Sequence, residues 1–374
     1  MEKKSFLSRL TSSGGFKSFR SACLAIVLGL IFGFFVMLVA SPSNAFSGIV
    51  TVITGGFRKL PDVFYYAIPI MMTGLAVGFA FKMGLFNIGA SGQYTMGMFC
   101  ALYVGLAVTL PAPLENVRWV FCVLAGLLGG FVWGLIPGIF KALLNVNEVI
   151  TSIMFNYIGM YLVDMLIMQN SFLYQAEKTR TKYLPDSAQL PSLGIPTSNL
   201  NIAIFFAVIF AVVLYIVLNK TTFGYELRAT GFNKNAAEYA GMNGKRNIIL
   251  TMGIAGALAG LGGAFAILAP STIAGSSMTY EPISVIAANG FNGIAVALLG
   301  ASDPIGIVFA ALFVSLIQRG GTLASLWGYK PEIIDVVIAV IIYFSAFSAI
   351  MSASLGKLIG KMKKKNNKTE AEGE

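Results

Sequence analysis

Residues that commonly carry catalysis are scarce in this sequence. It has no histidine, which excludes a Ser–His–Asp triad, a Cys–His pair and a histidine-ligated metal or haem. Cys23, Cys100 and Cys122 stand in apolar runs without CxxC spacing, so we interpret them as small buried hydrophobic residues. The sequence has no GxxxxGK(S/T) phosphate loop. We therefore expect no catalytic residue, no metal site and no cofactor in this chain.

Polar side chains inside long apolar runs are the remaining candidates for function. These residues are Asn87, Ser91, Gln93, Asn156, Asp164, Asn289 and Asn292. Because polar groups in an apolar environment are costly, each is expected to face a polar solute or to hydrogen-bond a neighbouring helix. Both interpretations stay open: a translocation path for a sugar or nucleobase, and a set of contacts between helices.

Two groups among them have a further pattern. Asn156 and Asp164 are eight residues apart, close to two helical turns, so they share a face with Tyr157 and Tyr161 nearby. The glycine-rich segment 84–97 is predicted to be either a re-entrant element beside the path or a turn between two spans.

The composition indicates the environment of these residues. Of the 374 residues, 56% are hydrophobic and 11% are charged, and the mean hydropathy is +0.78. Soluble domains carry about 25% charged residues, so this chain has too few charges to solvate its surface. A polytopic membrane protein is predicted, and 41 glycines fit helices that approach one another closely.

Runs of about 20 mostly apolar residues predict an all-α fold of ten transmembrane helices. The predicted spans are 22–40, 61–81, 93–110, 119–140, 149–168, 201–218, 248–269, 283–300, 304–321 and 332–354. A basic N-terminus (1–21) precedes this transmembrane domain (22–354), and a charged tail (355–374) follows it. Because the number of spans is even, both termini lie on one side.

The basic residues indicate which side this is. With a cytoplasmic N-terminus, 18 of the 26 Lys and Arg residues fall in cytoplasmic segments, as the positive-inside rule requires. Both termini are therefore predicted to be cytoplasmic. We interpret the terminal basic clusters as contacts with anionic membrane lipid and not with nucleic acid.

The cytoplasmic loop 219–247 is predicted to contain a short helix. Asn233 can cap a helix over residues 235–240, and Gly241 or Gly244 can end it. Its alanines give a smooth face and its tyrosine gives one bulky anchor. Such a helix suits docking into a groove of a partner, but a connector lying on lipid headgroups explains the same pattern.

Three stretches in order along the chain resemble the permease subunits of ABC importers, in the ribose, branched-chain amino acid and nucleoside group. The first is Phe86-Asn87-Ile88-Gly89-Ala90-Ser91-Gly92-Gln93, and the last is Gly290 to Gly300 followed by Pro304 and Gly306. Between them, the motif that resembles the ATPase-coupling loop consists of Gly224, Arg228, Gly231, Asn233, Ala236, Ala237, Tyr239 and Gly241. Phe232 and Lys234 depart from the family pattern, which has an acidic residue and a proline there. The resemblance is closest to nucleoside importer permeases.

This resemblance implies a type II ABC-importer fold in a bacterial cytoplasmic membrane. It implies alternating access driven by separate ATPase subunits through loop 219–247, with nucleosides or related sugars as substrate. The implied partners are a second, paralogous permease subunit and an extracytoplasmic substrate-binding lipoprotein. The two Asn- and Gly-rich segments 84–97 and 289–300 are consistent with inverted repeats.

A different class of transporter fits the composition as well. An ion-coupled secondary transporter of a small polar solute would use Asp164 and Asp335 as its coupling carboxylates. The sequence shows no evident charged pair or relay for this role. The spacings Gly126/Gly130 and Gly256/Gly260 predict tight helix crossings in either case.

Overall fold

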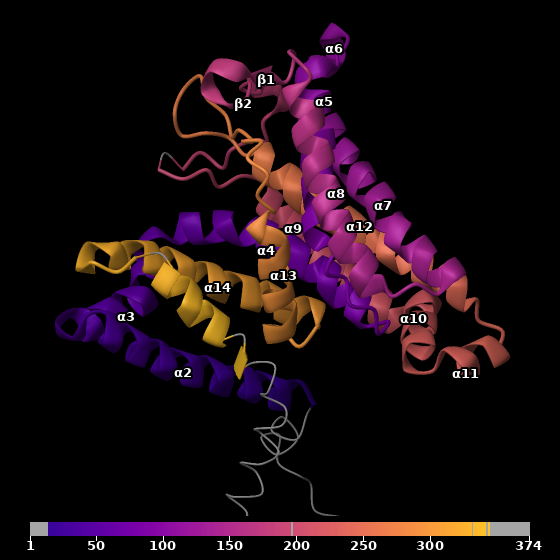
Figure 1. The fold of residues 1–374 in the computed structure, drawn as a ribbon, viewed down its shortest axis with the longest axis horizontal. Coiled ribbons are helices and arrows are strands. Elements are labelled where there is room, and N and C mark those ends of the chain that lie inside the picture. Colours follow the sequence, from indigo (N-terminus) through magenta and orange to yellow (C-terminus); the bar gives the residue numbers. More distant parts are fainter. Residues whose placement is uncertain (1–13, 196, 331, 342, 345–374) are drawn as a thin grey trace, which may run out of the picture. The chain divides into compact units, whose positions relative to one another are not determined.

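Six helices are long and apolar enough to cross a membrane, within the described residues 14–195, 197–330, 332–341 and 343–344 of this computed structural model. They are α4 (Leu60–Phe81), α7 (Arg118–Leu144), α8 (Glu148–Met168), α9 (Ala203–Lys220), α12 (Gly244–Ile267) and α14 (Pro304–Ala324). Each overlaps one of the ten predicted spans. The predicted all-α membrane fold is therefore confirmed (Figure 1).

The other predicted spans are helical over part of their length. The first is covered by α2 (Gly14–Ala40), and the third mostly by α5 (Ala90–Ala107). Residues 332–341, in the tenth, are helical. Outside the described residues lie 1–13 of the predicted basic N-terminus, 345–354 of the tenth predicted span and the predicted tail 355–374.

The eighth predicted span is shorter than expected. Helix α13 runs only from Ala288 to Leu299, because the residues before it form irregular chain. Ser284 has a φ of +56°, a left-handed conformation that is incompatible with a right-handed helix. The prediction of a full span at 283–300 is therefore wrong, and a 12-residue helix preceded by the loop 268–287 takes its place.

The described chain divides into two compact units, and the larger one is Gly56–Arg319. The smaller unit contains α2, α3 (Ala45–Thr54) and the chain from Gly320 onward. Within it, the Tyr329 hydroxyl donates a hydrogen bond to the Ser41 carbonyl at 2.9 Å. The 3-10 helices of the described chain are η1 (Pro42–Asn44), η2 (Gly55–Lys59), η3 (Ala176–Lys178), η4 (Asp186–Ala188) and η5 (Ser325–Trp327).

The core of the larger unit is the crossing of α7 with α12, where glycines on each helix lie against the backbone of the other. A Cβ atom added to Gly260 would lie 2.5 Å from the Gly126 carbonyl oxygen, and one added to Gly130 would lie 2.6 Å from the Cα of Gly260. Gly97 of α5 lies against the same glycine, Gly260, and against Gly126 of α7, so three helices meet closely at this point. The predicted tight crossings are confirmed, and α12 is the central helix of this unit.

Between α9 and α12, the chain forms two short helices, α10 (Thr222–Phe232) and α11 (Lys234–Tyr239). Asn233 caps α11, since its side-chain oxygen accepts a hydrogen bond from the Ala236 N–H at 3.0 Å. Gly241 follows with a φ of +84°, the left-handed position that ends a helix and favours glycine. The predicted short helix and both of its ends are confirmed.

The glycine-rich segment after the second predicted span is a turn followed by an unbroken helix. α4 ends at Phe81, residues 82–89 form the turn, and α5 runs without interruption from Ala90. This is the second of the two predicted alternatives. The turn 82–89 brings the polar residues at the start of α5 next to those of α8.

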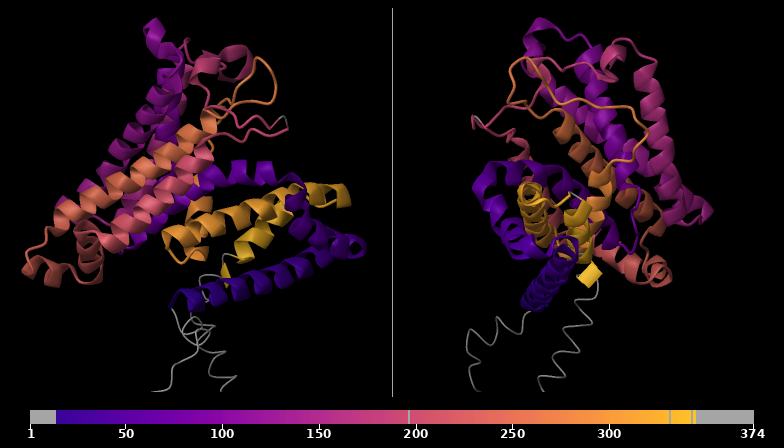
Figure 2. Two further views of the ribbon diagram at one scale, coloured as in Figure 1. Left: turned by 180° about the vertical axis from the view of Figure 1, so that it is seen from behind. Right: turned by 60° about the vertical axis from the view of Figure 1, so that its left-hand side comes forward.

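Two segments on the predicted outer side, the chain between α8 and α9 and the loop 268–287, lie against each other (Figure 2). The chain between α8 and α9 contains a small hairpin of β1 (Tyr174–Gln175) and β2 (Arg180–Thr181). The Thr181 N–H donates to the Tyr280 carbonyl at 2.9 Å, and the Thr181 hydroxyl accepts from the Tyr280 N–H at 3.0 Å. These bonds join the hairpin to the loop 268–287. The short helix α6 (Ala112–Glu115) precedes α7.

We predict that Gly130→Leu destabilises the larger unit. The new side chain would meet the backbone of α12, so the helices must separate, which costs about 1–3 kcal/mol for an overpacked core. The midpoint of thermal unfolding of the detergent-purified protein should fall. Ala125→Val is the matched control, because Ala125 of the same helix lines a cavity of about 570 Å³ with room for two methyl groups. Equal midpoints for the two variants would contradict the central role of this crossing.

Candidate functional site

The loop between α9 and α12 presents its most exposed side chains around α11. Tyr239 is 94% exposed and Phe232 is 95% exposed, whereas Ala237 is buried against the rest of the loop. Large aromatic side chains at such exposure lose little conformational entropy when a partner covers them. Phe232 and Tyr239 are therefore accessible to a partner, while Ala237 fixes α11 against the rest of the loop.

The remaining residues of the predicted coupling motif shape this loop. Gly224 lies against the backbone of Leu218, where α9 meets α10. The Arg228 Nε donates to the Gly224 carbonyl at 3.3 Å, and this arginine is otherwise exposed. Ala236 is also exposed. All eight residues of the motif therefore lie in the same loop. Gly224 and Ala237 are buried within it, and the others are exposed.

A buried asparagine fastens α10 to the start of α12. The Asn247 side chain donates to Glu226 Oε2 and to the Thr230 hydroxyl, each at 3.3 Å. Leu227, between these two acceptors in α10, is fully buried. α10 is therefore attached to the first turns of a helix in the core, while α11 projects from it (Figure 1).

A second group of predicted residues forms a closed hydrogen-bond cluster. Asn87 and Gln93 bond reciprocally through their amides, at 2.9 and 3.2 Å. Asn156 accepts from the Gly92 N–H at 2.7 Å and donates to the Ile88 carbonyl at 3.0 Å. Asn87, Gln93 and Asn156 are all buried. This geometry fixes the end of the turn 82–89 against α8, as interhelical hydrogen bonds do.

The start of α5 also packs against the start of α13. The Ser91 hydroxyl donates to the Ala287 carbonyl at 3.0 Å. Asn289 donates to the Tyr94 hydroxyl at 3.0 Å, and its carbonyl accepts from the Thr73 hydroxyl at 2.8 Å. Asn289 and Asn292 are half-buried, so they are the most accessible of the predicted path residues inside the spans.

Asp164 is 2% exposed and binds the loop 268–287. Its carboxylate accepts from the Tyr280 hydroxyl at 2.6 Å, from the Ser284 N–H at 2.8 Å and from the Ser284 hydroxyl at 3.3 Å. Burial, together with the Asp164 carboxylate, raises the pKa of the Tyr280 hydroxyl above its ordinary value. The proton therefore stays on the tyrosine, which remains a donor to Asp164.

The predicted polar face of α8 is only partly correct. Asn156 and Asp164 do share the buried face of this helix. Tyr157 and Tyr161 are exposed, at 47% and 57%. At about 100° per residue they lie about 20° and about 60° beyond Asp164 around the helix, so they stand at the edge of the buried face and not within it.

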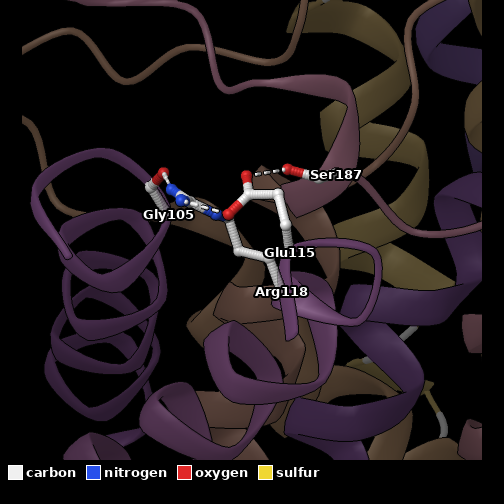
Figure 3. Close-up of polar contacts among 4 residues, drawn as sticks. All are labelled: Gly105, Glu115, Arg118 and Ser187. Atoms are coloured by element: carbon white, nitrogen blue, oxygen red, sulfur yellow. Dashed lines mark hydrogen bonds and ion pairs between the residues drawn. The ribbon is translucent and has the colours of Figure 1, made fainter. Parts of the chain in front are cut away.

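One ionic contact on the predicted outer side was not predicted from the sequence. Arg118, buried at the start of α7, donates to the Gly105 carbonyl at 2.9 Å and to Glu115 Oε2 at 2.8 Å (Figure 3). Glu115 Oε1 accepts from the Ser187 hydroxyl at 2.8 Å. The Arg118 hydrogen bond, followed by that from Ser187, lowers the pKa of the Glu115 carboxyl. The pairing of Arg118 with Glu115 was visible in their i, i+3 spacing, but Ser187 and Tyr280 gave no local signal.

We predict that Tyr280→Phe loosens the loop 268–287. The substitution removes the hydroxyl that donates to the buried Asp164 carboxylate, which should destabilise the attachment of the loop by about 1–3 kcal/mol. Limited proteolysis of the purified protein should cut this loop faster. Tyr183→Phe is the control, since Tyr183 is exposed and packs through its ring against Arg180. Cleavage at the unsubstituted rate in Tyr280→Phe would show that Asp164 does not hold the loop.

Comparison with known proteins identifies the family. The family model for the branched-chain amino acid transport system/permease component matches residues 59–346. The chain is 37% identical over 340 residues to the guanosine ABC transporter permease protein NupP of Bacillus subtilis (strain 168), covering 90% of this chain and 95% of the relative. It is 36% identical over 362 residues to the nucleoside ABC transporter permease protein NupB of Lactococcus lactis subsp. cremoris (strain MG1363), covering 94% and 96%.

A second permease of Bacillus subtilis (strain 168), the guanosine ABC transporter permease protein NupQ, is 26% identical over 78% of this chain and 90% of its own length. No solved structure matches the chain. The family model covers most of the larger unit and part of the smaller one. The chain therefore belongs to the family of branched-chain amino acid transport system permease components, the membrane-spanning subunits of ABC transporters.

Proposed function

We propose that the chain is the permease subunit of an ATP-driven importer of nucleosides. Two relatives that the chain matches over almost their whole length are named as guanosine and nucleoside permeases. The observation that carries the coupling part of the proposal is α11 itself: a capped, exposed helix that projects from α10. Nucleosides cross by alternating access, and the chain supplies the path and the lever but no covalent chemistry.

Separate subunits supply the energy and the substrate. ATPase subunits contact α11 and the exposed residues around it, including Arg228 and Tyr239. A substrate-binding lipoprotein docks on the outer segments, where the hairpin β1–β2 and the loop 268–287 are joined. The chain resides in the bacterial cytoplasmic membrane with both termini inside, and residues 22–354 form its transmembrane domain.

The second permease subunit is a paralogue and not another copy of this chain. Bacillus subtilis has two guanosine permeases, and this chain is 37% identical to NupP but 26% identical to NupQ. A chain that resembles one member of such a pair more than the other fits one half of a heterodimer. Copurification of this chain with a paralogous permease from the same organism tests this assignment.

Within the membrane, the predicted path residues divide into two roles. Asn87 and Gln93 bond each other, and Asn156 bonds the backbone of Gly92 and Ile88, so we assign all three to holding helices in place. Asn289 and Asn292 of α13 are half-buried, and we assign them to the wall of the path. Ser91 belongs with the first group, because its hydroxyl joins the starts of α5 and α13.

We predict that Tyr239→Ala uncouples the transporter. Removing an aromatic anchor from the centre of an interface costs about 2 kcal/mol or more, so ATP-dependent nucleoside uptake into proteoliposomes should fall at least about tenfold. Tyr239→Phe keeps the ring and is the matched control, with uptake close to the unsubstituted level. Arg228→Glu should likewise reduce uptake while the protein still inserts into the membrane. Full uptake by both Tyr239→Ala and Arg228→Glu would remove the coupling role of this loop.

The variant Asp164→Asn distinguishes an ATP-driven importer from an ion-coupled transporter. Because the carboxylate is occupied by three hydrogen bonds from the loop 268–287, we expect the amide to weaken this anchor but to leave uptake measurable. Uptake should be inhibited by vanadate and should persist with an ionophore. Complete loss of uptake in Asp164→Asn, together with sensitivity to ionophores, would favour the secondary transporter.

A further inference from the structure

α10 and the turn 82–89 touch backbone to backbone. A Cβ atom added to Gly231, in the last turn of α10, would lie 2.5 Å from the carbonyl carbon and oxygen of Met83 and 2.8 Å from its Cα. These are distances that side-chain rearrangement cannot relieve, since the obstacle is backbone. Glycine at this position therefore permits a contact that every other residue excludes.

The opposite side of the contact is glycine as well. Gly84 has a φ of +74°, and a Cβ added there would lie 3.3 Å from the Gly231 carbonyl oxygen. A residue with a side chain would be strained by the left-handed backbone and crowded by α10. The close approach therefore depends on a glycine in each of two segments that are far apart in the sequence.

The turn is also held from the side of α12. The Thr251 hydroxyl donates to the Met83 sulfur at 3.1 Å, and Met83 is buried. Asn247, one turn earlier in α12, holds α10 through Glu226 and Thr230. α10, α12 and the turn 82–89 therefore meet in one place without an intervening flexible segment.

Charged side chains surround the same place. Lys82 precedes Met83 and interacts electrostatically with Asp303 and Arg228. Burial lowers the pKa of Lys82, Asp303 opposes this shift and Arg228 adds to it. Asp303 in turn accepts from the Gly306 N–H at 3.1 Å, at the start of α14. The charge of Lys82 is therefore sensitive to Arg228 of α10 and to Asp303, just before α14.

The far end of the turn is fixed to the buried polar cluster. Asn87 is bonded to Gln93, and the Ile88 carbonyl to Asn156. Three residues separate Met83 from Asn87, and both ends of this short stretch are held by hydrogen bonds. Movement of Met83 must therefore shift the start of α5, and with it the start of α13 through Ser91.

We propose that Gly231 and the turn 82–89 form a fixed joint through which movement of the coupling loop reaches α5 and α13. Gly231 and Gly84 are positioning residues: neither touches substrate, and each acts by allowing the backbones to meet. The joint rests on the proposed function, because it needs a partner that moves α11. It names the place where that movement enters the membrane domain.

The test is Gly231→Val in the complex coexpressed with its ATPase, binding protein and second permease. The ATPase should still copurify and hydrolyse ATP, because α11 is unchanged, while nucleoside uptake falls about tenfold, within the usual range of coupling between sites. Gly244→Val is the matched control in the same loop, where the nearest atom to an added Cβ is the flexible end of the Glu238 side chain at 3.1 Å. Normal uptake by Gly231→Val would overturn the joint.

Gly84→Ala tests the joint from its other side, in the turn 82–89, which lies outside the coupling loop. If Gly231→Val fails to retain the ATPase, Gly84→Ala decides: loss of uptake with retained ATP hydrolysis supports the joint, and normal uptake overturns it. The double variant Gly84→Ala/Gly231→Val should lose less uptake than the product of the losses in Gly84→Ala and Gly231→Val, since both open the same contact. Multiplying losses would mean two separate defects and would overturn the joint.

Tyr239→Ala distinguishes failure of the joint from failure of the proposed function. If Tyr239→Ala and Arg228→Glu transport normally, the loop does not couple ATP hydrolysis to uptake, and the proposed function fails. If they are uncoupled while Gly231→Val and Gly84→Ala transport normally, the loop couples by another route and only the joint fails.

Discussion

The close approach of α7 and α12 is the contact on which the larger unit depends. Side chains at Gly126, Gly130, Gly256 or Gly260 would push the two helices apart. Inside a membrane, burial of apolar surface does not favour helix association, so van der Waals contact between backbones takes over much of that role. Because α4 and α5 also pack on α12, the distance between α7 and α12 sets where the polar residues at the start of α5 lie.

Several of the buried polar groups hold the segments where helices begin or end. The cluster of Asn87, Gln93 and Asn156 joins the start of α5 to α8, and Asp164 joins α8 to the loop 268–287. An unsatisfied polar group is costly in this environment, so such bonds hold an irregular segment in one conformation. They give irregular segments of the large apolar unit a defined conformation.

Sequence patterns predicted the elements well and the contacts between distant elements poorly. Apolar runs located the spans, and Asn233 with Gly241 located α11, because capping and left-handed glycines act within a few residues. The length of α13 was missed because Ile283 and Val285 continue the apolar run, whereas Asp164 holds the backbone of Ser284 in an irregular conformation. Tyr280 and Ser187 were missed for the same reason: their partners are about a hundred and about seventy residues away. Gly231 was recognised as part of a motif, but its contact with Met83 has no signature in one sequence.

Three successive helices from the loop 219–247 onward carry their own N-terminal caps: Thr221 for α10, Asn233 for α11 and Asn243 for α12. Each cap is a local bond within three residues, so the shape of the loop is encoded without help from a bound partner. Association with another subunit then has less chain to order, and preorganisation of this kind strengthens binding by lowering its entropic cost. A loop ordered in advance is also a stiff one, able to pass on a displacement in place of bending under it.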